Sequence, residues 1–172
     1  MNSPVLRPLA LVEWDVATRP VAGQAVSGDL HVVKPFEQGV LIAVVDGAGH
    51  GDKATAAARA AVSVMEAHAH DSVISLVRRC HRALTSTRGA VLTVASIRSA
   101  DHTLTWLGVG NVEGRLLRAD RDGSHPAESV LLRSGLVGYQ LPASESTRHS
   151  RRCGRPACAG HGRRRQPVRG NS

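Results

Sequence analysis

The segment between residues 40 and 51 constrains the fold most strongly. It starts with an apolar run, Val40 to Val45, that ends at a single carboxylate, Asp46. Three glycines follow within five residues, and an alanine-rich helical pattern comes directly afterwards. A continuous apolar run of this kind predicts a strand buried on both faces. The sequence therefore predicts a buried strand, a tight glycine turn and a helix, with a carboxylate at the junction.

Two aspartates are candidate metal ligands. Asp46 would present a hard oxygen at the rim of a core, and Mg²⁺ and Mn²⁺ prefer carboxylates, carbonyls and water. The glycines after it allow a tight turn and a close approach to the backbone. Asp29, in Ser27-Gly28-Asp29, lies on a predicted strand that can pair beside Asp46, so that the two carboxylates would meet at one end of a sheet. The alternatives are that Asp46 caps the following helix and that Asp29 is an ordinary turn residue.

Composition limits the class of protein. A length of 172 residues predicts one domain, and 42% hydrophobic residues are enough for a core. Aromatic residues make up only 2%, so this core must consist of Val, Leu, Ile and Ala. No apolar run is long enough to span a membrane, and the N-terminus predicts no signal peptide. Three cysteines do not form a disulfide framework, which favours a cytoplasmic location.

The net charge of +8 is concentrated in the last thirty residues. Residues 1–142 hold 14 Lys and Arg against 13 acids, whereas residues 143–172 hold 8 Arg and one Glu. The basic segment has no helical or strand period. It is interpreted as a disordered arm for acidic partners, as a metal-binding knuckle, or as an out-of-frame translation of a GC-rich gene. The third interpretation is favoured.

The hydrophobic periodicity predicts an antiparallel α+β layer fold, because the order is strands, two helices, then strands. Helices are expected over Lys53–Ala69, with a small-residue face, and from Asp71-Ser72 onwards, with Cys80 as a buried thiol on the apolar stripe. Strands are expected at Leu9–Ala17, Val26–Val33, Val40–Val45, Ala90–Ile97, Thr103–Val109, Val112–Leu117 and Ser129–Leu132.

Five ordered segments resemble the SpoIIE-like branch of the metal-dependent PPM serine/threonine phosphatases, over about Leu9 to Leu141. They are Glu13-Trp14 with Ala17–Pro20, Ser27–Asp29, Val45–Gly51, Cys80-His81 with Thr87–Ala90, and Trp106–Glu113.

The resemblance implies an antiparallel β-sandwich flanked by helices, with metals at one end. It implies hydrolysis of phosphoserine or phosphothreonine on regulators of a bacterial stress-response sigma-factor pathway, organised by a stressosome. Two Mn²⁺ or Mg²⁺ ions would be held by Asp46, the carbonyl of Gly47, and Asp29. Two metals can generate hydroxide near neutral pH, so no protein nucleophile is expected beyond the metal site.

The resemblance stops at Pro142. Related sequences continue through further strands, and one of these carries a second Asp-Gly motif that completes the metal site. The only later Asp-Gly here is Asp122-Gly123, in a polar turn. We therefore expect a phosphatase domain over residues 1–142 that is incomplete at its C-terminus, followed by the separate segment 143–172, with metal binding weakened or lost.

Two alternatives come from other classes of protein. One is a noncatalytic module that docks the same signalling partners. The other is a nucleic-acid-binding protein that uses the arginine-rich segment. Residues 1–142 argue against this hypothesis, because they have no basic face and few aromatics to stack on bases. No membrane partner is expected.

Overall fold

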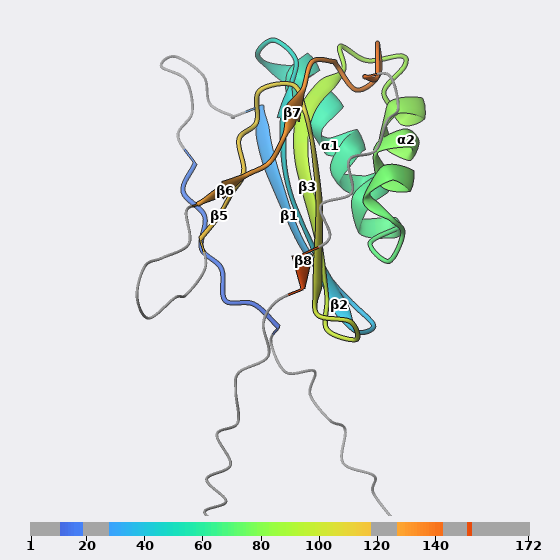
Figure 1. The fold of residues 1–172 in the computed structure, drawn as a ribbon. Helices are drawn as coiled ribbons and strands as arrows, with labels where there is room; N and C mark the ends of the chain where they lie inside the picture. The colour runs from blue at the N-terminus through green and yellow to red at the C-terminus, as the bar shows by residue number, and fades with distance from the viewer. Residues whose placement is uncertain (1–10, 19–27, 118–126, 143–150, 153–172) are drawn as a thin grey trace, which may run out of the picture.

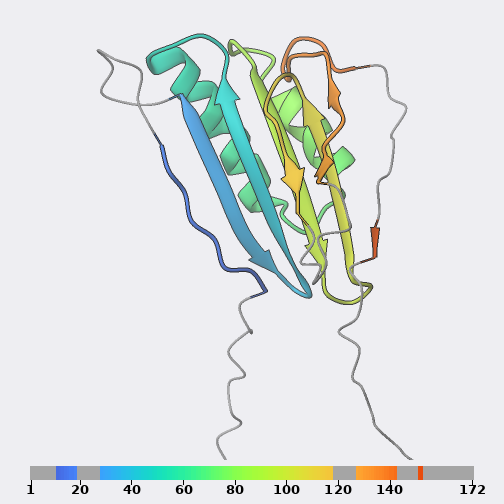
Figure 2. The same ribbon diagram turned by 60° about the vertical axis from the view of Figure 1, so that its left-hand side comes forward.

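The computed structural model of this chain describes residues 11–18, 28–117, 127–142 and 151–152. A large, mostly antiparallel sheet forms the centre, and both helices cover one of its faces (Figure 1). A small two-stranded sheet lies on the opposite face, as the second view also shows (Figure 2). The predicted α+β architecture is confirmed.

Four strands make up most of the large sheet. They are β1 (Asp29–Phe36), β2 (Gly39–Gly47), β3 (Ala90–Arg98) and β4 (Thr103–Val109), paired antiparallel in that order. Two short strands extend the β4 edge: β7 (Leu132–Arg133) runs parallel to β4, and β8 (Arg151–Arg152) antiparallel to it. The small sheet consists of β5 (Arg115–Leu116) and β6 (Glu128–Ser129).

The two helices join β2 to β3. Helix α1 (Asp52–Ala67) packs its predicted small-residue face on the sheet, with Ala54, Ala57, Ala58, Ala61 and Met65 fully buried. Helix α2 (Val73–Ala83) begins at Ser72, whose side chain accepts a 3.2 Å hydrogen bond from the N–H of Ser75, as the capping pattern predicted. No helix within the described ranges is long and apolar enough to cross a bilayer.

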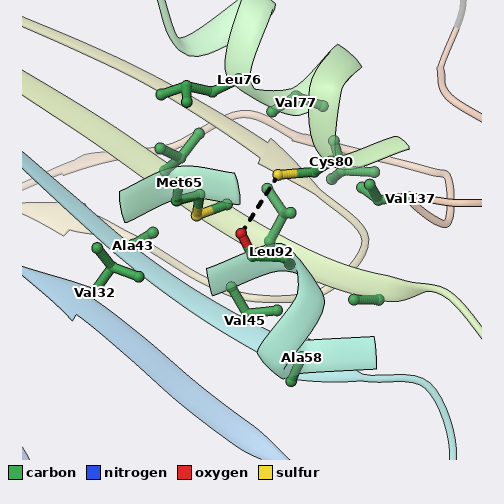
Figure 3. Packing of buried hydrophobic residues seen from close by; sticks show 14 of the residues in the cluster. Val32, Ala43, Val45, Ala58, Met65, Leu76, Val77, Cys80, Leu92 and Val137 are labelled. Atoms are coloured by element: carbon green, nitrogen blue, oxygen red, sulfur yellow. Dashed lines mark hydrogen bonds between the residues drawn. The ribbon is translucent and has the colours of Figure 1, made fainter. Parts of the chain in front are cut away.

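The main core lies between the helices and the sheet (Figure 3). Alternate residues of β2 and β3 point into it, because successive strand side chains face opposite sides. With aromatics so scarce, medium-sized aliphatic side chains fill it, as predicted: Val32, Leu41, Val45, Met65, Leu76, Leu84, Leu92 and Val94 are all buried.

The other face of β2 differs from the prediction. Val40 is buried, but the side chain of Val44 is 46% exposed. The expectation that Val40–Val45 is buried on both faces is therefore wrong for Val44. The small sheet covers only part of this face: the hydroxyl of Thr93, on β3, donates to the carbonyl of Val112 shortly before β5.

Several element boundaries were predicted wrongly near the N-terminus. Residues 11–17 of the expected strand Leu9–Ala17 form no strand, and residues 9–10 lie outside the described part of the chain. The next strand starts at Asp29 and continues through Pro35 and Phe36, beyond the expected end at Val33. Pro35 is tolerated because β1 is an edge strand.

The sequence predicted longer strands after β4 than the structure contains. Only Arg115–Leu116 of the expected strand 112–117 is a strand. The expected strand 129–132 is divided between the end of β6 and the start of β7, and residues 130–131 belong to neither. Apolar runs of this length do not indicate where pairing starts. Of the segment 143–172, the structure describes only Arg151 and Arg152, which pair with β4.

Candidate metal centre

Asp29 and Asp46 lie directly opposite each other on β1 and β2. The register of the two strands makes them Cα partners at one end of the pair. Both belong to the face opposite the helices, because Val45 is part of the core and side chains alternate along a strand. Asp46 is half-buried and Asp29 is exposed. The structure thus brings together the two carboxylates that the sequence singled out.

The two carboxylates are electrostatically coupled. Desolvation by burial raises the pKa of Asp46 above its usual value, and the negative charge of Asp29 and the hydrogen bond that protonated Asp46 donates to it raise the pKa further. Two like charges in adjacent strand positions resist simultaneous ionisation. A bound cation would relieve this repulsion and let both groups be charged.

The loop after Asp46 is held by the neighbouring strand ends. The N–H of Gly47 donates to the carbonyl of Gly28 at 3.2 Å, and the N–H of Ala48 donates to the carbonyl of Gly89 at 2.9 Å. Gly49 has a φ of 94° and Gly51 a φ of 72°, a region that favours glycine. Helix α1 starts after Gly51, which is its N-cap. The alternative that Asp46 caps this helix is therefore wrong.

The oxygen donors at this site suit a hard divalent cation. Two carboxylates and the carbonyl that follows Asp46 are oxygen ligands of the kind that Mg²⁺ and Mn²⁺ prefer. Across the residues that the structure describes, no group of three or more His, Cys, Asp or Glu side chains is placed to hold a metal. The described residues thus provide a two-carboxylate site.

Comparisons with known proteins point to one kind of protein. No family model matches the chain. It is 31% identical over 90 residues to phosphoserine phosphatase RsbX of Bacillus subtilis strain 168, which is 52% of this chain and 45% of that protein. A crystal structure of RsbX in complex with magnesium is 26% identical with a TM-score of 0.66, covering 76% of this chain and 63% of that one. The chain has an RsbX-like PPM phosphatase fold.

A second solved structure, described as part of a study of the bacterial stressosome as a modular system, agrees with this RsbX-like assignment. It is 32% identical, with a TM-score of 0.66, and the match covers 72% of this chain and 62% of that one. The chain thus spans less than two thirds of each of these relatives, and about half of the curated RsbX sequence.

Arg88 lies beside the loop that follows Asp46 and was not predicted as part of the site. A Cβ on Gly49 would come within 2.8 Å of Nη1 of Arg88, so the guanidinium lies over the loop that follows Asp46. The sequence contained one signal for it, the Thr87-Arg88-Gly89 motif that precedes a predicted strand. Only the strand register shows that this motif meets the glycine loop.

Cys80 plays no part in the two-aspartate site. It is fully buried between the two helices, with its Sγ 3.8 Å from the carbonyl oxygen of Ala61 (Figure 3). Burial raises the pKa of its thiol to about 12. The neighbouring His81 instead accepts a 3.0 Å hydrogen bond from the N–H of Gly138 at its Nδ1. The prediction of a buried structural thiol is confirmed.

A cavity of about 520 Å³ lies at the opposite end of β1 from Asp29. It is formed between residues 11–18 and the sheet, and Trp14, Phe36 and Val40 contribute to its wall. Its lining is largely apolar and contains no carboxylate or histidine. It therefore does not belong to the two-aspartate site.

Proposed function

We propose that this chain is a metal-dependent protein phosphatase domain that hydrolyses phosphoserine or phosphothreonine. The observation that carries the proposal is the direct pairing of Asp29 with Asp46 at one end of an RsbX-like sheet. Two carboxylates at such a position are costly without a cation, since burial and the charge of Asp29 both disfavour ionisation of Asp46. The similarity to a phosphoserine phosphatase supports the choice of reaction.

In this proposal the carboxylates of Asp29 and Asp46 and the carbonyl of Gly47 hold Mn²⁺ or Mg²⁺, two ions in the complete site. The bound metal would supply a water of lowered pKa as nucleophile and would neutralise charge on the phosphoryl oxygens. The chain's own contribution is to fix the ligands. The β1–β2 ladder holds the aspartates in register, and hydrogen bonds from Gly47 and Ala48 to the neighbouring strand ends fix the loop.

The substrates that we propose are phosphorylated regulators of a stress-response sigma-factor pathway, assembled in a stressosome-type complex. Support comes from the similarity to RsbX and to a protein solved in a stressosome study. The domain would comprise residues 1–142, with 143–172 as a separate segment. A cytoplasmic location stays a prediction from the cysteine usage.

The first test is Mn²⁺-dependent release of phosphate from a phosphoserine regulatory protein by the full chain. Asp46→Ala should abolish this release because it removes a metal ligand. Asp101→Ala is a matched control: this exposed aspartate lies in the β3–β4 turn, at the far end of the sheet. It should leave the rate unchanged.

Either of two results would reject the phosphatase. One is hydrolysis that is indifferent to Asp46→Ala. The other is a folded, inactive wild-type protein that still captures the phosphorylated regulator, which would leave the noncatalytic docking module as the function.

A further inference from the structure

The register of the sheet places Arg88 opposite residues 47–51, the loop that follows Asp46. We call this loop the metal loop. Strand β2 pairs with β3 so that Gly47 faces Ala90. The same antiparallel register, continued by two residues, puts Arg88 across from Gly49. The 2.8 Å separation between Nη1 and the position of a Gly49 Cβ agrees with this placement. The guanidinium therefore lies on the loop that Asp46 begins.

The backbone on either side of Arg88 is fixed by hydrogen bonds. The hydroxyl of Thr87 donates to the carbonyl of Leu84 at 2.8 Å and accepts from the N–H of Gly89 at 3.0 Å. The carbonyl of Gly89 in turn accepts from the N–H of Ala48. Arg88 is thus carried on a hydrogen-bonded turn that is tied directly to the metal loop, rather than on a free surface segment.

The charge of Arg88 is available to a ligand. The side chain is exposed, and it forms no ion pair with any other residue in the described ranges. The guanidinium thus lies over the loop that follows Asp46, and its charge is not taken up by a neighbouring carboxylate among the described residues.

We propose that Arg88 binds the phosphoryl group of the substrate next to the Asp29–Asp46 pair. This inference rests on the proposed phosphatase function. A phosphoryl dianion that approaches two carboxylates is repelled unless cations compensate, and Arg88 supplies a positive charge from the chain itself. The planar guanidinium can donate two parallel hydrogen bonds to phosphate oxygens, which also orients the group.

The test measures binding of inorganic phosphate to the full chain by calorimetry, with Mn²⁺ at saturating concentration. Arg88→Ala should weaken phosphate binding by about tenfold to hundredfold, as expected for hydrogen bonds to charged groups. Arg88→Lys should have a phosphate affinity between those of the wild type and Arg88→Ala, because lysine keeps the charge and loses the geometry for two parallel hydrogen bonds. Arg82→Ala, which removes another exposed arginine at the end of α2, is the matched control and should bind as the wild type does.

Binding of Mn²⁺ itself, followed by its paramagnetic signal, separates this role from metal ligation. Arg88→Ala should bind Mn²⁺ as the wild type does, and in turnover it should raise KM for the phosphoserine protein. Equal phosphate affinity of the wild type and Arg88→Ala, or no phosphate binding by the wild type, would overturn the inference. Failure of the proposed function would look different. Phosphate would bind and Arg88→Ala would weaken that binding, but no hydrolysis that depends on Asp46 would be measured.

Discussion

The α-carbon of Gly47 lies against the carbonyl oxygen of Ala54, on the side where any other residue would carry its Cβ. Helix α1 therefore starts in contact with the last residue of β2, immediately after Asp46. This contact requires glycine for reasons of space, since the atoms in the way belong to the helix backbone and cannot swing aside. The position of α1 and that of Asp46 are thus linked through one residue.

Gly47→Ala should consequently lower the free energy of unfolding by about 1–3 kcal/mol, the usual cost of overpacking a core. Chemical denaturation monitored by circular dichroism measures the change. His50→Ala is the control within the same loop, because the side chain of His50 is exposed. If both variants unfold at the wild-type denaturant concentration, the contact between strand and helix does not constrain the loop.

Local patterns sufficed to predict the parts of the fold with long, regular periodicity. The small-residue face of α1 and the apolar stripe of α2 were visible because every third or fourth residue is apolar. The pairing of Asp29 with Asp46 was foreseen as a possibility, since Asp29 lies on a predicted strand that can pair beside Asp46. Which residues pair in the sheet is a long-range property, so confirming it required the register.

The long-range nature of strand pairing also explains which features the sequence did not predict. Arg88 is 39 positions beyond Gly49, and only the β2–β3 ladder brings them together. The exposure of Val44 depends on how far the small sheet extends over the outer face, and no pattern within β2 carries that information. The metal-ligand roles of Asp29, Asp46 and Gly47 stay predictions.

Cys80 should be unreactive in the native protein. A thiol with a pKa of about 12 is ionised to about one part in ten thousand at pH 8, and its sulfur is also buried between α1 and α2. Iodoacetamide in excess, followed by peptide mass spectrometry, should leave Cys80 unlabelled in buffer and label it fully in denaturant. The measurement resolves Cys80 from Cys153 and Cys158 by their peptides. Rapid labelling in buffer would show that the helix pair opens easily.

Asp46→Asn should stabilise the metal-free protein at neutral pH. The folded structure raises the pKa of Asp46, so between the unfolded value of about 3.9 and that raised value the native state binds more protons than the unfolded state. Wild-type stability should therefore fall as the pH rises through this window and stay lower above it. The amide cannot ionise, so the variant should lose this part of the pH dependence. Thermal unfolding in chelator from pH 4 to 8 measures both effects.

The order of stability should reverse when Mn²⁺ is added. A ligand that binds only the native state at a hundred times its Kd adds about 2.7 kcal/mol to the wild type, whereas Asp46→Asn should gain little. Asp101→Asn serves as the control in both conditions. The pKa of Asp101 is lowered, chiefly by a hydrogen bond from Thr103, so neutralising it should not stabilise the metal-free protein. Equal Mn²⁺ shifts in the wild type and Asp46→Asn would mean that the metal binds elsewhere, and that the carboxylate pair is only an electrostatic cost to the fold.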